Sequence, residues 1–218
     1  MIMRTLKLSW LFALVIASSS AQAVTITVAN NDGAGEGFND TTAVTPVAGN
    51  AGTTRGAQRL NAFTAAANAW GAILGGNVTV VVSAQMNPLT CNQSSALLGS
   101  AGATTSFRDF TGAPRASTWY PIALANQLRG SDLNGSSSEI SAQFNSTLDA
   151  GSCLNGTTWW YGINSPAPAG TLDFYTVVLH EIGHGLGVAT LVNNSSGEKA
   201  LGFDDIYMVF LQDHTSGK

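Results

Sequence analysis

The chain has 218 residues, with nine Lys and Arg against 13 Asp and Glu and a formal net charge of −4. Charged residues make up only 10% of it, and no basic cluster is present that would neutralise phosphates, so nucleic acid is excluded as an expected partner. The length suits one domain that buries a substantial core.

The first 23 residues have the pattern of a secretory signal peptide. A basic start with Arg4 and Lys7 precedes a short apolar run, and small residues up to Ala23 provide a cleavage site. The run is about half of the ~20 residues that span a bilayer, which disfavours a membrane anchor. We therefore expect residues 1–23 to be removed, and residues 24–218 to form one secreted or periplasmic domain without a membrane span.

Three regular elements are expected to open this domain. Val24–Asn30 alternates β-branched residues and is predicted to be a strand. After a loop, apolar residues recur every three or four positions over Arg55–Leu74, which predicts an amphipathic helix ended by Gly75. Asn77–Met86 is rich in valine and is predicted to be a second strand.

The middle of the chain has weaker patterns. Pro88–Ser117 is expected to be irregular, Pro121–Gly130 to be a short helix, and Glu139–Asn145 to be a half-exposed strand. The aromatic run Trp159–Tyr161 is expected to pack over the core rather than line a cleft.

The two cysteines, Cys91 and Cys153, are expected to form one disulfide in an oxidising compartment. The alternative is a thiolate that caps a metal in a latent form, and the residues around Cys91 do not favour it.

The last part of the chain is expected to contain two helices. Thr171 or Asp173 can cap a helix that runs through His184, whose end is loosened by the glycines up to Gly187. Phe203–Leu211 is predicted to be a second helix.

The most specific pattern is H-E-x-x-H, which lies in an apolar helical setting within Val177–Gly187. Residues four apart share a helix face, so His180 and His184 are placed to bind one metal ion. Neutral imidazoles bind Zn²⁺ at about 2.0–2.1 Å and leave it able to acidify a coordinated water. Glu181 lies about 100° further around the helix and is the candidate general base that takes the proton of this water.

With Gly187 the motif extends to H-E-x-x-H-x-x-G, and this stretch resembles the zincin superfamily of metallopeptidases, in particular the start of the metzincin motif. Together with Phe203–Asp205 and the Leu-x-Asp at Leu211–Asp213, it is similar to exported bacterial predicted metallopeptidases that often carry a protease-associated domain. The resemblance implies an α+β, zincin-like fold. This fold has a mixed twisted sheet, an upstream helix carrying Trp70 and an active-site helix, and its C-terminal part is incomplete if the chain is a fragment. It also implies that a peptide substrate lies along an edge strand, here Glu139–Asn145.

The third zinc ligand departs from the metzincin pattern. A metzincin has His or Asp three residues after Gly187, where this chain has Thr190, a poor zinc ligand. The main candidates are Asp204 and His214, and Glu198, Asp205 and Asp213 are further ones. If the chain is a fragment, the ligand lies beyond Lys218.

These patterns predict an exported zinc metallopeptidase, a hydrolase that acts on a protein or peptide with Zn²⁺ as its cofactor. Two alternatives remain open. An exported, non-catalytic surface or adhesive module would keep the fold with an incomplete metal site, which Thr190 favours. A different zinc hydrolase, such as an amidase acting on cell-wall peptides, would share the site but not the substrate.

Overall fold

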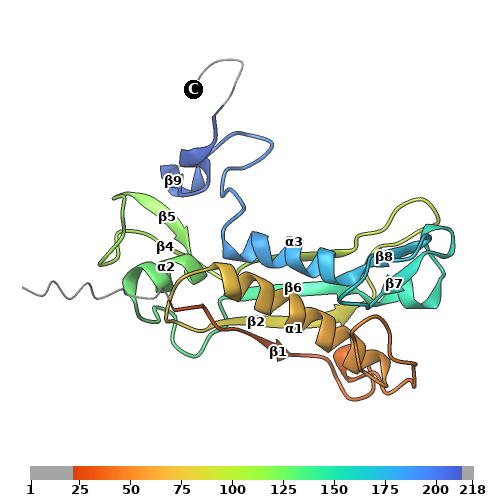
Figure 1. The fold of residues 1–218 in the computed structure, drawn as a ribbon. Coiled ribbons are helices and arrows are strands. Elements are labelled where there is room, and N and C mark those ends of the chain that lie inside the picture. The colour runs from red at the N-terminus through yellow and green to blue at the C-terminus, as the bar shows by residue number, and fades with distance from the viewer. Residues whose placement is uncertain (1–21, 213–218) are drawn as a thin grey trace, which may run out of the picture.

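The computed structural model describes residues 22–212, so the predicted signal peptide falls outside the described residues except for its last two positions. A four-stranded sheet forms the centre of the molecule, with the strand order β1-β2-β6-β3 (Figure 1). Its strands are β1 (Ile26–Asn30), β2 (Val80–Asn87), β6 (Ile140–Asn145) and β3 (Gly99–Ala103). β1, β2 and β6 run parallel, whereas β3 is antiparallel to β6 at the edge. The fold is therefore a mixed α+β arrangement, as the sequence predicts.

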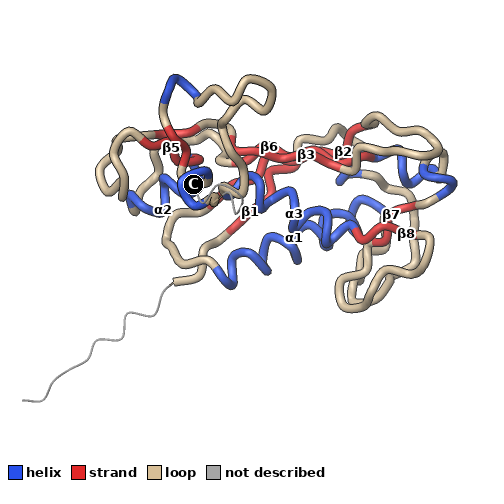
Figure 2. The backbone as a smooth tube through the Cα atoms, turned by 90° about the horizontal axis from the view of Figure 1, so that it is seen from above, coloured by secondary structure: helices blue, strands red, loops and turns tan. Residues whose placement is uncertain are grey.

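Two long helices cover one face of this sheet. α1 (Arg55–Ile73) and α3 (Phe174–Leu186) lie side by side there, and the shorter α2 (Ile122–Arg129) lies toward one end (Figures 1 and 2). Between the helices and the sheet lies the apolar core, whose fully buried side chains include Phe63, Val80, Val82, Ile140, Phe144, Phe174, Val178 and Ile182. The predicted strands and helix of the opening segment are confirmed to within a few residues.

Aromatic rings fill the core at the N-terminal end of α3. Phe174 meets Phe144, Trp159 and Tyr161 in edge-to-face contacts, with ring centroids 5.2–5.3 Å apart. The strand β7 (Thr158–Trp160) pairs with β8 (Thr171–Asp173), which leads directly into α3. Core packing is confirmed for Trp159 and Tyr161, which are 5% and 6% exposed.

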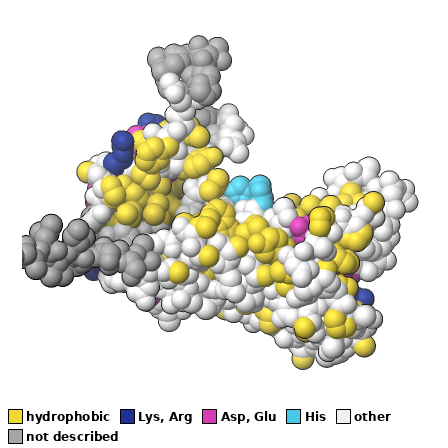
Figure 3. All heavy atoms as spheres, in the orientation of Figure 1, with side chains coloured by type: hydrophobic (Ala, Val, Ile, Leu, Met, Phe, Trp, Pro, Cys, Tyr) yellow, Lys and Arg dark blue, Asp and Glu magenta, His cyan; other side chains and the backbone are white. Residues whose placement is uncertain are grey.

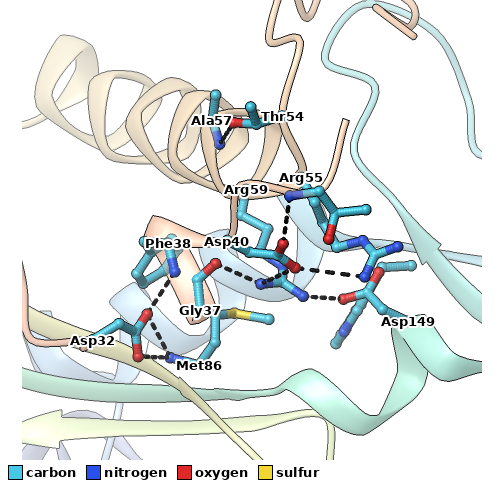
Figure 4. Close-up of polar contacts among 12 residues, drawn as sticks. Asp32, Gly37, Phe38, Asp40, Thr54, Arg55, Ala57, Arg59, Met86 and Asp149 are labelled. Carbon is cyan, nitrogen blue, oxygen red and sulfur yellow. Dashed lines mark hydrogen bonds and ion pairs between the residues drawn. The ribbon is translucent and has the colours of Figure 1, made fainter. Parts of the chain in front are cut away.

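A buried arginine joins the loop after β1 to the rest of the domain. Figure 4 shows Gly37, Asp40 and Asp149 gathered around Arg59 of α1. The guanidinium donates to the Gly37 carbonyl and to Asp149, both at 2.5 Å, and to the Tyr161 hydroxyl at 3.1 Å. Burial raises the pKa of Tyr161 well above its ordinary value, and the negative charge of Asp149 acts in the same direction. This network therefore holds Tyr161 protonated and fixes the loop against α1.

Three segments differ from the sequence-based prediction. Pro88–Ser117 is not irregular throughout, because it contains β3 and β4 (Ser106–Phe107). Glu139–Asn145 is not a half-exposed edge strand, because β6 lies inside the sheet between β2 and β3. Phe203–Leu211 is not a helix, because it contains the short strand β9 (Asp204–Asp205) and a turn of 3-10 helix. In each case pairing with a distant strand decides the local structure, which short-range periodicity does not report.

The remaining elements are short. β5 (Thr118–Pro121) pairs with β4 and with β9 to form a small sheet beside the main one. Short 3-10 helices are η1 (Gly37–Asn39), η2 (Ser146–Ala150), η3 (Leu154–Gly156), η4 (Ala200–Gly202) and η5 (Met208–Phe210).

The predicted disulfide is present. Cys91 and Cys153, with Cα atoms 5.8 Å apart, join the loop after β2 to the start of η3. A disulfide is typical of a protein that folds in an oxidising compartment. Within residues 22–212, no helix is both long and apolar enough to cross a membrane.

Candidate metal centre

The two motif histidines lie on the outer face of α3. His180 is exposed and His184 is partly buried, and Figure 3 shows their imidazoles at the surface, between two raised parts of the molecule. The Nε2 atoms of the two rings are 2.9 Å apart, and the ring planes are almost perpendicular, at 89°. The helical spacing therefore brings both nitrogens to one point, as the sequence predicts.

The chain reversal after α3 determines which nitrogen of His184 is free. Gly187, with φ at +127°, ends the helix and turns the chain back. The Val188 carbonyl consequently lies 2.8 Å from Nδ1 of His184. A carbonyl oxygen can only accept, so Nδ1 carries the proton and Nε2 keeps its lone pair. A backbone carbonyl bound to the second nitrogen is a common support for a metal-binding imidazole.

The spacing of the two nitrogens fits a shared cation. Two imidazole nitrogens on a tetrahedral zinc, each about 2.05 Å from the metal, are about 3.3 Å apart. The observed 2.9 Å is close to this value. Because Nε2 of His184 presents a lone pair to Nε2 of His180, either a proton or a cation must lie between them.

The candidate base is also on α3. Glu181 follows His180 directly and is 9% exposed, so its carboxylate is largely shielded while the neighbouring imidazole is open to solvent. The structure thus places Glu181 on the same helical turn as the first histidine. All three predicted residues, His180, Glu181 and His184, therefore lie on the C-terminal half of α3, and the two imidazoles contact one another.

The predicted third ligands do not join this pair. Residues 22–212 contain no group of three His, Cys, Asp or Glu that could hold a metal. Thr190 donates to the buried Asp205 at 2.7 Å, and Asp205 also accepts from the backbone. Asp204 forms an ion pair with Lys199 at 2.5 Å, and Glu198 lies in an exposed loop. In this structure Asp204, Asp205 and Glu198 therefore do not form a metal-holding group with the two histidines, whereas Asp213 and His214 lie outside the described residues.

The glycines of the motif have a packing role. A Cβ on Gly185 would collide with the side chain of Ile140 in β6, and one on Gly183 would lie 3.3 Å from the Trp70 ring. Trp70 also donates through its indole nitrogen to the Leu179 carbonyl at 2.9 Å. α3 continues past both glycines to Leu186, and they let it approach α1 at Gly183 and the sheet at Gly185.

Sequence reasoning did not identify the Val188 carbonyl, which contacts His184, or the edge strand β3 beside α3. A backbone acceptor has no signature of its own, although Gly187 indicates the turn that delivers it. The chain matches none of the family models, curated proteins or solved structures with which it was compared. Its function is consequently inferred from the motif and from the geometry around it.

Proposed function

We propose that this chain is an exported zinc-dependent peptidase of the zincin type, with His180 and His184 as zinc ligands and Glu181 as the general base. The observation that carries the proposal is the approach of the two Nε2 atoms to 2.9 Å on an open helix face. Zinc held there would polarise the scissile carbonyl and lower the pKa of a water molecule.

The residues of α3 have distinct tasks in this proposal. His184 is held in one tautomer by Val188, so its Nε2 stays available as a ligand. Glu181 is largely buried beside His180, and a carboxylate in this position accepts a proton from water and returns it to the leaving amine. His214 and Asp213 are kept as the candidates for a third ligand.

The edge strand β3 supports a peptide as the substrate. β3 lies next to α3, and its outer side has no partner strand among the described residues. Its sequence Gly-Ser-Ala-Gly-Ala has only small side chains, so an extended peptide can reach its backbone groups. A substrate added as a further strand would therefore lie along β3, which takes the role that the resemblance predicts for Glu139–Asn145.

Export is proposed on two observations. The signal pattern of residues 1–23 is a sequence feature, and the disulfide Cys91–Cys153 fits an oxidising compartment. The signal pattern and the disulfide agree equally with secretion and with a periplasmic location.

The lack of a third ligand among residues 22–212 favours one alternative, an exported surface or adhesive module that binds no zinc or binds it without turnover. One experiment distinguishes this non-catalytic module from the peptidase. The full chain is loaded with zinc, its zinc content is measured by elemental mass spectrometry, and cleavage of fluorescein-labelled casein is followed.

For the peptidase, we expect about one zinc per chain, and cleavage that chelation abolishes. Glu181→Gln should retain zinc and lose at least about 100-fold in kcat/KM, because the amide keeps the shape but cannot accept the proton. Glu36→Gln, a change at an exposed residue outside α3, is the matched control and should cleave like the parent. A Glu181→Gln variant that cleaves as fast as the parent would refute Glu181 as the general base. Zinc-loaded protein that cleaves nothing would instead support the non-catalytic surface or adhesive module.

A further inference from the structure

A cavity of about 180 Å³ adjoins the second histidine. His184 forms part of its lining, together with the last residues of β3, Gly102 and Ala103. The opposite walls come from β5 and from the segment after α3, through Trp119, Pro121, Leu191, Ile206 and Tyr207. The cavity therefore lies where the proposed substrate strand would pass the metal ligands.

The lining of the cavity is mainly apolar. Its one charged residue is Asp205, which is 3% exposed. Both carboxylate oxygens of Asp205 are occupied, because they accept from the Thr190 hydroxyl and from the backbone of Leu191 and Met208, each at 2.7 Å. The cavity thus offers hydrocarbon to an occupant and leaves no free charge to pair with a charged one.

The walls of the cavity are held in place before any ligand arrives. Trp119 donates through its indole nitrogen to the Ala200 carbonyl at 3.0 Å, and its own carbonyl accepts from Ile206 at 2.9 Å. The Arg108 guanidinium lies over the Trp119 and Phe203 rings, 5.3 and 4.0 Å from their centroids. β5 and β9 are thereby fixed to one another, and a side chain entering the cavity does not have to organise it.

The volume of the cavity limits the size of the group that it can bind. Pockets for whole small-molecule ligands usually begin at about 300 Å³, whereas this cavity holds the volume of about six liquid waters. It is therefore suited to one large side chain.

We infer that this cavity is a specificity pocket that takes one apolar side chain of the substrate, of the size of Leu, Ile or Met, close to the scissile bond. This inference rests on the proposed peptidase function. It adds that peptides with an aliphatic residue at one fixed position are preferred over peptides with a small polar or acidic one.

The first test is the cleavage of a peptide library by the zinc-loaded full chain, with the cut sites mapped by mass spectrometry. The parent should prefer Leu, Ile or Met over Ser at one position by at least about 10-fold in kcat/KM. Leu191→Arg, which brings a charge to the wall at a residue 43% exposed, should reduce this preference to about threefold or less. Leu97→Arg, at a residue 47% exposed outside the cavity lining, is the matched control and should keep the parent's preference.

The second test needs neither zinc nor turnover. N-acetyl-leucinamide and N-acetyl-serinamide are titrated into zinc-free protein, and the Trp119 indole N–H resonance, assigned by its loss in Trp119→Phe, is followed by NMR. If the pocket binds an apolar side chain, N-acetyl-leucinamide should shift the Trp119 indole resonance. The shift should be lost in Leu191→Arg and kept in Leu97→Arg.

The outcomes of the two tests separate the pocket from the peptidase. Cleavage without a preference that depends on Leu191 would overturn the pocket and leave the peptidase standing. The Trp119 shift in a protein that cleaves nothing would support the pocket and overturn the peptidase. Equal responses to the two amides would overturn the pocket.

Discussion

Gly187 supports the candidate centre from the position just after α3. Its φ of +127° is accessible to glycine but strained for other residues, and it brings the Val188 carbonyl to within 2.8 Å of His184. A Cβ at this position would also lie 3.0 Å from the ring of Pro121. The orientation of one proposed zinc ligand, His184, therefore depends on a residue that makes no side-chain contact itself.

Gly187→Ala should lower the free energy of unfolding by about 1–3 kcal/mol because of backbone strain. It should also weaken zinc binding about 10–100-fold, because the Val188 carbonyl would move away from His184. Urea denaturation and a competitive zinc titration measure the two effects. Gly197→Ala, at a left-handed turn with open space around the Cβ, is the control and should destabilise the fold without changing zinc affinity. Unchanged zinc affinity in both variants would show that the Val188 contact does not position His184.

At the level of single elements, α3 packs closely on its neighbours at two glycines. Gly185 faces Ile140 without room for a Cβ, and Gly183 faces the edge of the Trp70 ring. Glycine inside a helix normally weakens it by about 0.5–1 kcal/mol relative to alanine. In α3 this cost is offset by the close approach of the helix to the sheet at Gly185.

Gly185→Ala should therefore destabilise the protein by about 1–3 kcal/mol, although alanine is the better helix former. Gly183→Ala should be nearly neutral, since its Cβ would meet a ring atom at 3.3 Å while the helix gains propensity. A double-mutant cycle of Gly185→Ala with Ile140→Ala, measured by urea denaturation, should show a favourable coupling. Additive effects would mean that the two residues do not meet as described.

Elements with strong local periodicity could be predicted from the sequence. The helix Arg55–Ile73, the strand Val80–Asn87 and the motif helix were accessible because their apolar spacing and flanking residues agree. β3 could not be predicted, because Gly-Ser-Ala-Gly-Ala has no strand preference and takes its extended form from pairing with β6. β9 likewise depends on β5, more than 80 residues earlier. Helical spacing predicted that the two motif histidines lie together, which the 2.9 Å between their Nε2 atoms confirms. The hydrogen bond between Thr190 and Asp205 could not be predicted, because it depends on the tertiary fold.

At the scale of the whole molecule, the buried Arg59 network joins segments that are distant in the sequence. Arg59 on α1 meets Gly37 in the first loop, and Asp149 and Tyr161 near the start of α3. Asp149 also accepts from the Tyr161 hydroxyl at 2.8 Å. The network therefore stabilises the frame on which α3 is mounted, at a distance from the histidines.

This network predicts a loss of stability at alkaline pH. Burial raises the pKa of Tyr161 well above its unfolded value of about 10, so the unfolded chain releases this proton at a pH where the folded chain keeps it. The stabilisation is complete below pH 10 and falls above it by up to about 1.4 kcal/mol per pH unit. Urea denaturation at several pH values should give Tyr161→Phe a shallower decline above pH 10, whatever its stability at pH 7. Identical slopes for parent and variant would show that Tyr161 does not remain protonated in the fold.

Zinc-edge diffraction from crystals of the zinc-loaded full chain tests the central claim most directly. We predict one anomalous peak per chain about 2.0–2.1 Å from Nε2 of both His180 and His184, with any further protein ligand visible in the same map. If the map has no peak between these two nitrogens, whether zinc is found elsewhere in the crystal or nowhere, His180 and His184 are not zinc ligands.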